Sequence, residues 1–275
     1  MGLYIVNSVI TWVFDLLFRP FIGGPGWLSL SVFSALASVF GLLVYKYTSN
    51  QPAIRAVKDR IKADMLAIKL FKDDPVAMFR CFGGVLISSM RLLRYSLLPL
   101  AIMVVPFILV MIQLGSRYQW QPLEVGDEAV VIAQVSPDVD LNSATVSLVG
   151  DGGFNVETPT LRIPSENEVA WRIRAGKPGV HELRIVANGE TASKVLNVGG
   201  GFPRISPKRP GANLGDQVLY PSESPLAAGS AIRSISVTYP DRDGWFSGST
   251  VWLFWLMGLS FVLAYVFKPI LRVEF

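Results

Sequence analysis

Hydrophobic positions gather into three long runs along the chain, at residues 27–47, 95–115 and 249–268. A helix needs roughly 20 apolar residues to cross about 30 Å of hydrocarbon, and each run reaches that length. Charged side chains stand only at the ends of these runs, as Lys46 does in the first. A charge at the centre of a span would cost about 2.5–3.5 kcal/mol. The pattern therefore predicts three transmembrane helices.

Residues 1–26 predict an interfacial amphipathic helix followed by a turn. Asn7, Thr11 and Asp15 recur every four residues and form one polar stripe, whereas most neighbouring positions are apolar. A helix of this kind lies in the plane of the membrane interface. The Gly- and Pro-rich residues 23–26 then turn the chain into the first span. The alternative is a fourth span, which would place the amino terminus inside.

Residues 48–94 predict a helical hairpin with narrow, coiled-coil-like apolar seams. The first arm begins near Pro52, and the second begins at Pro75, with Asp74 as its cap. Apolar positions spaced by three or four residues form a seam on each arm. We expect the two seams to face each other: Ile54, Val57, Ile61, Met65 and Ile68 against Phe79, Phe82, Leu86, Met90 and Leu93.

A basic face follows the first arm of this hairpin, formed by Arg55, Lys58 and Lys62. One interpretation is that these side chains meet anionic lipid headgroups. The other is that they receive a ribosome, a nascent chain or a partner protein. Specific nucleic-acid recognition is not indicated, because these basic side chains are not accompanied by aromatic residues on which nucleobases could stack.

Residues 116–248 predict an all-β domain of the immunoglobulin-like sandwich type. Short runs rich in β-branched residues alternate with turn residues, and Asn188-Gly189 is a strong signal for a two-residue hairpin. Gly- and Pro-rich residues 199–230 predict a long loop. The expected strands are residues 129–135, 144–149, 169–174, 181–186, 192–198 and 232–239.

The distribution of charge predicts the orientation of the spans. Residues 46–94 hold ten basic and four acidic side chains, whereas residues 116–248 hold twelve basic and fifteen acidic ones. The positive-inside rule then places the hairpin and the tail 269–275 in the cytoplasm, with the amino terminus and the β-domain outside. The chain also lacks an Asn-x-Ser/Thr sequon. Together these features favour the inner membrane of a bacterium.

Composition argues against an enzyme. The chain has one cysteine, Cys81, and one histidine, His181, so neither a disulfide nor a multi-cysteine metal site can form within it. We expect His181 to be an ordinary polar residue on a strand. No nucleophile–base pair, metal-ligand cluster or phosphate loop is evident, and we expect no catalytic residue, metal or cofactor.

The order of these features resembles the YidC-type membrane insertase superfamily. The likeness rests on VNSVITWVFDLLFRP, IRAVKDRIKADMLAIKLFKDDPVAMFRCF and LLPLAIMVVPFILVMIQ, and it covers about residues 1–115 and 249–270. Short members, such as the third subunit of the ER membrane protein complex, are nearest in size. The external β-domain is an addition to the family's common core.

The resemblance implies an ATP-independent insertase with a hydrophilic groove inside the membrane. Bacterial members carry an Arg in the first span. The first span here has none and offers Ser31, Ser34 and Ser38 on one helical face, with Lys46 at its end. These four residues are the groove candidates. The alternative is that the serine stripe is a surface for close helix packing.

Two main functions follow from this layout. One is an insertase or intramembrane chaperone, with the lipid bilayer and membrane protein substrates as its partners. The other is a non-catalytic scaffold or accessory subunit of an envelope complex, which binds a partner through the external β-domain. A third is a sensor that passes an external binding event to the hairpin.

Overall fold

The computed structural model describes residues 2–21, 24–71, 73–141, 143–244, 248 and 250–273. It contains two compact units. The first, here called the β unit, comprises residues 1–29 and 110–254. The second, here called the helical unit, comprises residues 30–109 and 255–275.

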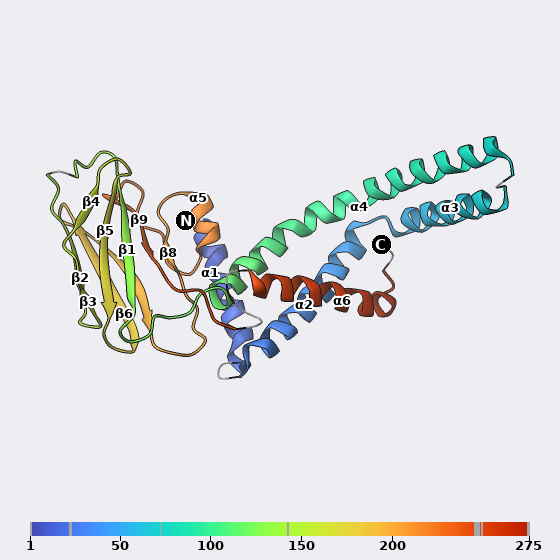
Figure 1. Ribbon diagram of the computed structural model, residues 1–275. Helices are drawn as coiled ribbons and strands as arrows, with labels where there is room; N and C mark the ends of the chain where they lie inside the picture. Colours follow the sequence, from blue (N-terminus) through green and yellow to red (C-terminus); the bar gives the residue numbers. More distant parts are fainter. Residues whose placement is uncertain are drawn as a thin grey trace. The chain divides into compact units, whose positions relative to one another are not determined.

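Three long helices dominate the chain: α2 (Gly26–Thr48), α4 (Pro75–Tyr118) and α6 (Val251–Leu271) (Figure 1). Each is long and apolar enough to cross a membrane by length and composition. The prediction of three such helices is confirmed. Helix α1 (Gly2–Phe18) has 17 residues and is not among them. A short 3₁₀ turn, η1 (Arg19–Phe21), follows it.

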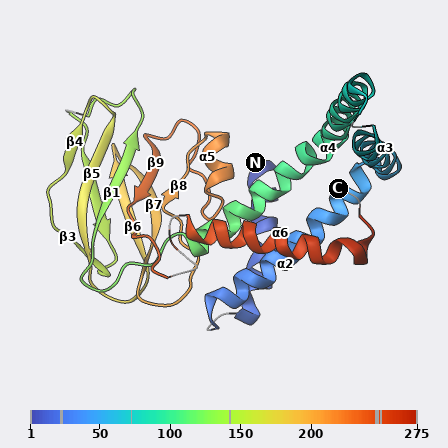
Figure 2. The ribbon, with the colours of Figure 1, turned by 45° about the vertical axis from the view of Figure 1, so that its right-hand side comes forward.

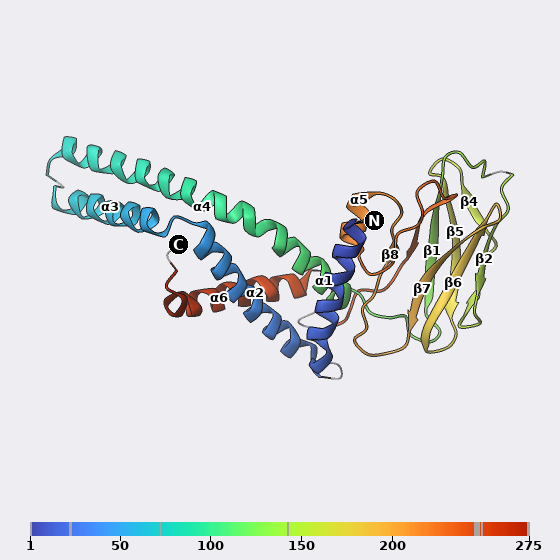
Figure 3. The ribbon, with the colours of Figure 1, turned by 180° about the vertical axis from the view of Figure 1, so that it is seen from behind.

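Helix α3 (Gln51–Leu70) runs antiparallel beside the first part of α4, which forms the hairpin (Figures 1 and 3). Side chains cap both arms as the sequence indicates. The Asn50 side chain accepts a hydrogen bond from the N–H of Ala53, and Asp74 Oδ1 accepts bonds from the N–H groups of Val76 and Ala77. Because α4 continues without a break through 44 residues, the second arm and the second span are one helix.

The predicted seam on the second arm is wrong. Its five apolar side chains, here called the α4 stripe, are all exposed, from 54% for Leu86 and Leu93 to 70% for Phe79: Phe79, Phe82, Leu86, Met90 and Leu93. At 100° per residue, the side of α4 opposite this stripe carries the small residues Gly84 and Ser88. Small residues make the contact with α3, so the large apolar ones point away from it.

The β unit holds two antiparallel sheets (Figures 1 and 2). One has the order β3-β5-β1-β9-β8, with β4 also paired to β5, and the other has the order β2-β6-β7. Side chains of both sheets form one apolar core that includes Val131, Ile173, Leu183 and Ile235. The strands are β1 (Glu128–Val135), β2 (Val146–Gly150), β3 (Phe154–Val156), β4 (Leu161–Ile163), β5 (Glu168–Ala175), β6 (Gly179–Ala187), β7 (Glu190–Val198), β8 (Lys208–Arg209) and β9 (Ile232–Val237).

Each of the six expected strands is present, as β1, β2, β5, β6, β7 and β9. The hairpin turn is also confirmed. Asn188 and Gly189 both have positive φ, 50° and 85°, and Ala187 pairs with Glu190 across them. The predicted long loop 199–230 instead contains β8 and the short helix α5 (Leu214–Leu219). Both elements are too short to produce a periodic sequence signal.

An ion pair lies buried in the β unit between Lys194 of β7 and Glu223. The Lys194 side chain is 0% exposed, and its Nζ donates hydrogen bonds to the Ser206 carbonyl, at 2.7 Å, and to the Glu223 carboxylate. The second Glu223 oxygen accepts from the N–H of Val195. Burial lowers the pKa of Lys194, and the Glu223 carboxylate opposes that change. The pair fastens residues 206 and 223 to β7.

We expect Lys194→Met to destabilise the β unit by about 3–5 kcal/mol, because Glu223 would then be a buried charge without its partner. The double variant Lys194→Met/Glu223→Leu should recover most of that loss. Hydrogen exchange of β7 amides in the full chain measures the effect. Arg184→Met is the control, since the Arg184–Glu182 pair is exposed and should leave exchange almost unchanged. Equal losses in the single and double variants would contradict this account.

Candidate functional site

The serine stripe of α2 lies at a helix–helix contact in the helical unit. Ser34 is fully buried, and its Oγ donates to the Leu30 carbonyl at 2.8 Å. Ser260 of α6 donates to the Ser34 carbonyl at 3.2 Å, so α6 lies beside α2 at this level (Figure 2). Ser31 is half-buried. The serines therefore bring two apolar helices close together.

Ser38 differs from its neighbours on the stripe. Its side chain is 4% exposed, and its Oγ has no hydrogen-bond partner among the described residues. An unpaired hydroxyl in an apolar surrounding costs roughly 1–3 kcal/mol. Of the serine candidates, Ser38 is thus the one with a buried polar atom left over for a ligand or a water molecule.

Lys46 closes the far end of this helix pair. Its Nζ donates to the carbonyl of Leu271, the last residue of α6, at 2.9 Å. The final carbonyls of a helix lack partners within the helix, and a lysine can satisfy one of them. Lys46 therefore fixes the end of α6, a role that its sequence position did not indicate.

The three basic residues predicted on α3 differ in their surroundings. Arg55 and Lys62 are exposed, whereas Lys58 is half-buried. Lys62 forms an exposed pair with Asp59 at 3.6 Å. Arg55 lines a cavity together with Lys268 and Arg272 near the end of α6. The structure thus brings Arg55 to two bases beyond the hairpin, and the sequence pattern gave no sign of that cluster.

A buried carboxylate lies between the two arms of the hairpin. Asp64 of α3 is 8% exposed, and a Cβ atom built on Gly84 of α4 would lie only 2.6 Å from Asp64 Oδ2. Arg60, one turn earlier on α3, stands 3.4 Å from the same oxygen. The missing side chain at Gly84 therefore makes room for the carboxylate. A Cβ on the adjacent Gly83 would meet no described atom within 4 Å.

In the β unit, the polar stripe of α1 faces protein. Asn7 donates to the Gln217 carbonyl at 2.8 Å, and the Thr11 hydroxyl accepts from Gln113 at 2.9 Å. Asp15 pairs with Arg117 at 2.5 Å and with Arg204 at 3.0 Å. The opposite face of α1 is apolar and exposed: Ile5, Val9, Trp12, Val13, Leu16 and Leu17. The polar side of α1 thus binds the rest of the β unit, and its apolar side is exposed.

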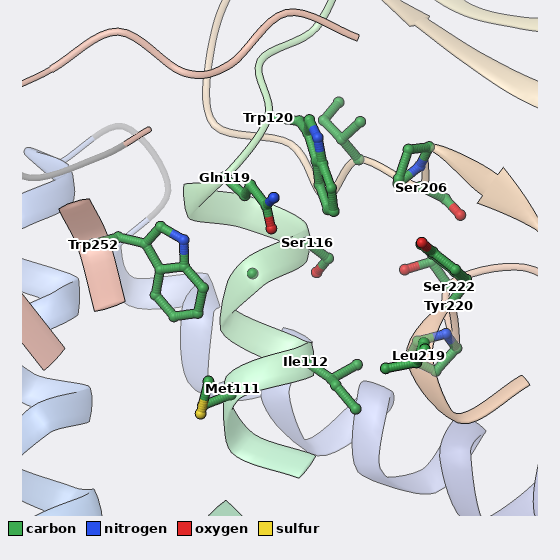
Figure 4. A pocket seen from close by; sticks show the side chains of 14 residues that line it. Met111, Ile112, Ser116, Gln119, Trp120, Ser206, Leu219, Tyr220, Ser222 and Trp252 are labelled. Carbon is green, nitrogen blue, oxygen red and sulfur yellow. The ribbon is translucent and has the colours of Figure 1, made fainter. Parts of the chain in front are cut away.

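A pocket of about 300 Å³ lies beside the last turns of α4, within the β unit (Figure 4). Most of its lining is apolar, from Met111, Ile112, Leu219 and Trp252. The Trp252 ring stacks on Tyr118, with 6.4 Å between ring centroids. Its Nε1 is buried and has no hydrogen-bond partner among the described residues. The wall of the pocket is therefore largely apolar.

The histidine of the chain has a structural place. His181 Nε2 lies 2.8 Å from the Lys177 carbonyl, and Nδ1 lies 3.3 Å from Asp151 Oδ2. The backbone N–H groups of Glu182 and Gly153 lower the pKa of Asp151. Within the described residues, no group of three or more His, Cys, Asp or Glu side chains is placed to hold a metal ion.

Gly83 and Gly84 provide a matched pair of substitutions for testing the hairpin contact. Gly83→Ala should stabilise the hairpin by up to about 1 kcal/mol through helix propensity. Gly84→Ala should lose this gain, because its Cβ displaces the Asp64 carboxylate, and Asp64→Ala/Gly84→Ala should restore it. Hydrogen exchange of α3 amides is the measurement. Identical behaviour of the two single variants would show that Asp64 does not rest on Gly84.

Comparison with known proteins adds no relative. No family model matches the chain. No curated protein matches it either. Functional inference for this chain therefore rests on its own residues and their geometry.

Proposed function

We propose that this protein is a membrane insertase or intramembrane chaperone of the YidC type in a bacterial inner membrane. In this proposal the hairpin and carboxyl terminus are cytoplasmic. The amino terminus is outside, together with the β-domain of residues 116–248, which is an immunoglobulin-like sandwich. Apolar segments of membrane protein substrates bind the hairpin and move along α4 into the bilayer. The observation that carries the proposal is the exposed α4 stripe on a helix that continues into a span.

The length of α4 supports a path from water to lipid. Its 44 residues extend about 66 Å at 1.5 Å per residue, roughly twice the thickness of the hydrocarbon core. About half of the helix therefore lies outside the bilayer when the other half spans it. The α4 stripe belongs to the half that lies outside the bilayer, on the hairpin side. Exposed Leu97, Leu100 and Val104 continue an apolar surface into the span.

The α4 stripe is costly to leave in water. Burying one large apolar side chain is worth about 1.5–3 kcal/mol, so five of them represent roughly 10 kcal/mol. That is comparable with the whole stability of a typical domain. A cover of lipid or of an apolar substrate segment removes this cost. Such a cover can exchange, and exchange is what a chaperone for membrane segments requires.

The polar groups of the helical unit suit the transfer of a substrate's hydrophilic part into the bilayer. A substrate's hydrophilic part pays a large desolvation cost when it enters hydrocarbon. Ser38, with its buried and unpaired hydroxyl, is a group that such a segment can use as a hydrogen-bond partner. In this proposal Ser31, Ser34 and Lys46 are positioning residues, because Ser34 and Lys46 hold α2 against α6.

Proteoliposomes that contain only the purified full chain test the proposal. We expect them to insert a single-span substrate, and Phe82→Gln/Leu86→Gln/Met90→Gln to reduce the rate about tenfold or more, because one apolar contact is worth about that factor. Glutamine keeps helix propensity high. The control is Val180→Thr/Leu161→Thr, which changes two exposed apolar residues of the β unit. Insertion at the wild-type rate by the triple variant would refute the role of the α4 stripe.

A second candidate function is an accessory subunit of an envelope complex. The observation that favours it is the pocket beside Trp252, whose largely apolar wall suits the apolar side chains of a partner helix. In that case depletion of the protein leaves membrane insertion unaffected, and a stoichiometric partner co-purifies in mild detergent. Leu219→Arg should then release the partner, whereas it should leave the insertase reaction of the first proposal intact, because residue 219 lies on α5 and outside the three spans.

A further inference from the structure

A basic cavity of about 540 Å³ lies at the end of α6 in the helical unit. Its lining consists of Arg55, Tyr265, Lys268, Pro269, Arg272 and Val273. Three of these side chains are cationic, and none of the described lining residues is acidic. Its volume lies in the range typical of small-molecule sites. The cavity is therefore large enough for a ligand, and its three cationic side chains favour an anion over a cation.

The end of α6 is built so that two of these bases are held in place. The N–H of Arg272 bonds to the Pro269 carbonyl at 3.3 Å, and that of Val273 bonds to the Lys268 carbonyl at 3.2 Å. This is the Schellman arrangement for ending a helix, and Val273 is buried as its apolar contact. Lys46 adds a hydrogen bond to the Leu271 carbonyl. The termination is thus rigid on both sides of the cavity.

Arg272 occupies a backbone position that normally belongs to glycine. Its φ is +51°, in the left-handed region, where a residue with a side chain costs about 1–2 kcal/mol. Glycine is the usual residue at this point of a Schellman motif because it avoids that cost. An arginine here makes the fold less stable than glycine would. The strain is thus borne at a position whose side chain lines the cavity.

The cavity lies at the depth of lipid headgroups when α6 spans a membrane. The helix has 21 residues, about 31 Å, which matches one hydrocarbon thickness. Lys268 stands in its last turn, after the apolar stretch, and Tyr265 is a residue type enriched at membrane interfaces. Basic pockets between spans on the cytoplasmic side are suited to anionic headgroups.

From these observations we infer that Arg55, Lys268 and Arg272 form a binding site for the phosphate headgroup of an anionic phospholipid. The inference rests on α6 spanning the bilayer, and it is separate from substrate transfer along α4. The phosphodiester accepts hydrogen bonds from the two guanidinium groups and the ammonium group. The acyl chains extend along the exposed apolar surface of α6, which includes Phe261 and Val262.

Native mass spectrometry of the full chain in detergent tests the site, with phosphatidylglycerol and phosphatidylcholine as probes. We expect phosphatidylglycerol to be preferred. Arg55→Gln/Lys268→Gln/Arg272→Gly should weaken its binding on the order of 100-fold, since each base near an anionic surface is worth about fivefold. The fold should survive, because glycine relieves the strain at position 272. The charge-matched control is Lys69→Gln/Arg80→Gln/Arg91→Gln, in which all three altered residues are exposed and outside the cavity lining; it should change binding less than threefold, a small fraction of the site's effect.

Three results would overturn the assignment. Equal binding of the two lipids would exclude an anionic headgroup site. Equal losses in the cavity variant and its control would mean that the surface charge as a whole attracts the lipid. Displacement of phosphatidylglycerol by millimolar inorganic phosphate would identify a soluble phosphate as the ligand. The site is supported if phosphatidylglycerol binding is lost in the cavity variant and is retained in the control.

Discussion

Hydrocarbon offers no partner for a hydrogen bond, and this constraint decides how the polar groups of the chain are arranged. The backbone of each long apolar segment satisfies itself within a helix. Polar side chains near these helices turn toward protein, as Ser34 does toward the Leu30 carbonyl and Asn7 toward the Gln217 carbonyl. Large apolar side chains are then free to face outward. The result is the reverse of a soluble domain, where the apolar side of a helix is the buried one.

Close approach in the helical unit depends on small residues, because lipid gives apolar helices no reason to bury large side chains against each other. Ser34 and Ser260 bring α2 and α6 together, and Gly84 admits the Asp64 carboxylate between α3 and α4. The hairpin follows this same rule although it extends beyond the span. Its large apolar residues on α4 consequently remain exposed.

Local and periodic signals in the sequence predicted much of the fold. Three apolar runs predicted the long helices, Asp74 and Pro75 the start of α4, and Asn188-Gly189 the hairpin turn between β6 and β7. The polar stripe of α1 predicted an amphipathic helix. That its polar side would bind Arg117, Arg204 and Gln217 was not predictable, because these partners are distant in the chain.

The errors have a common physical origin. Periodicity shows that residues share a face, but it does not show what covers that face. The sequence therefore predicts that the seam from Phe79 to Leu93 faces α3, whereas its side chains are exposed. The serine candidates were recognised as a stripe, yet only tertiary contacts distinguish Ser34, which is bonded, from Ser38, which is not. Lys46 donates to the last carbonyl of α6, and no spacing rule connects residues so far apart in the chain. The backbone conformation of Arg272 is set by the way α6 ends.

Two features of the helical unit lower its own stability, and we propose that a bound partner offsets each of them. The α4 stripe exposes large apolar side chains, and Arg272 holds a backbone conformation that glycine would adopt without strain. They differ in kind: the stripe selects for apolar surface, whereas the cavity at Arg272 selects for negative charge. A bilayer with anionic headgroups supplies both, hydrocarbon to one and phosphate to the other. In the two proposals, a bound lipid would hold the end of α6, while the exposed α4 stripe would release what it binds. The proposed insertase, which would stay in the membrane while passing other segments into it, would need this combination of tight and loose contacts.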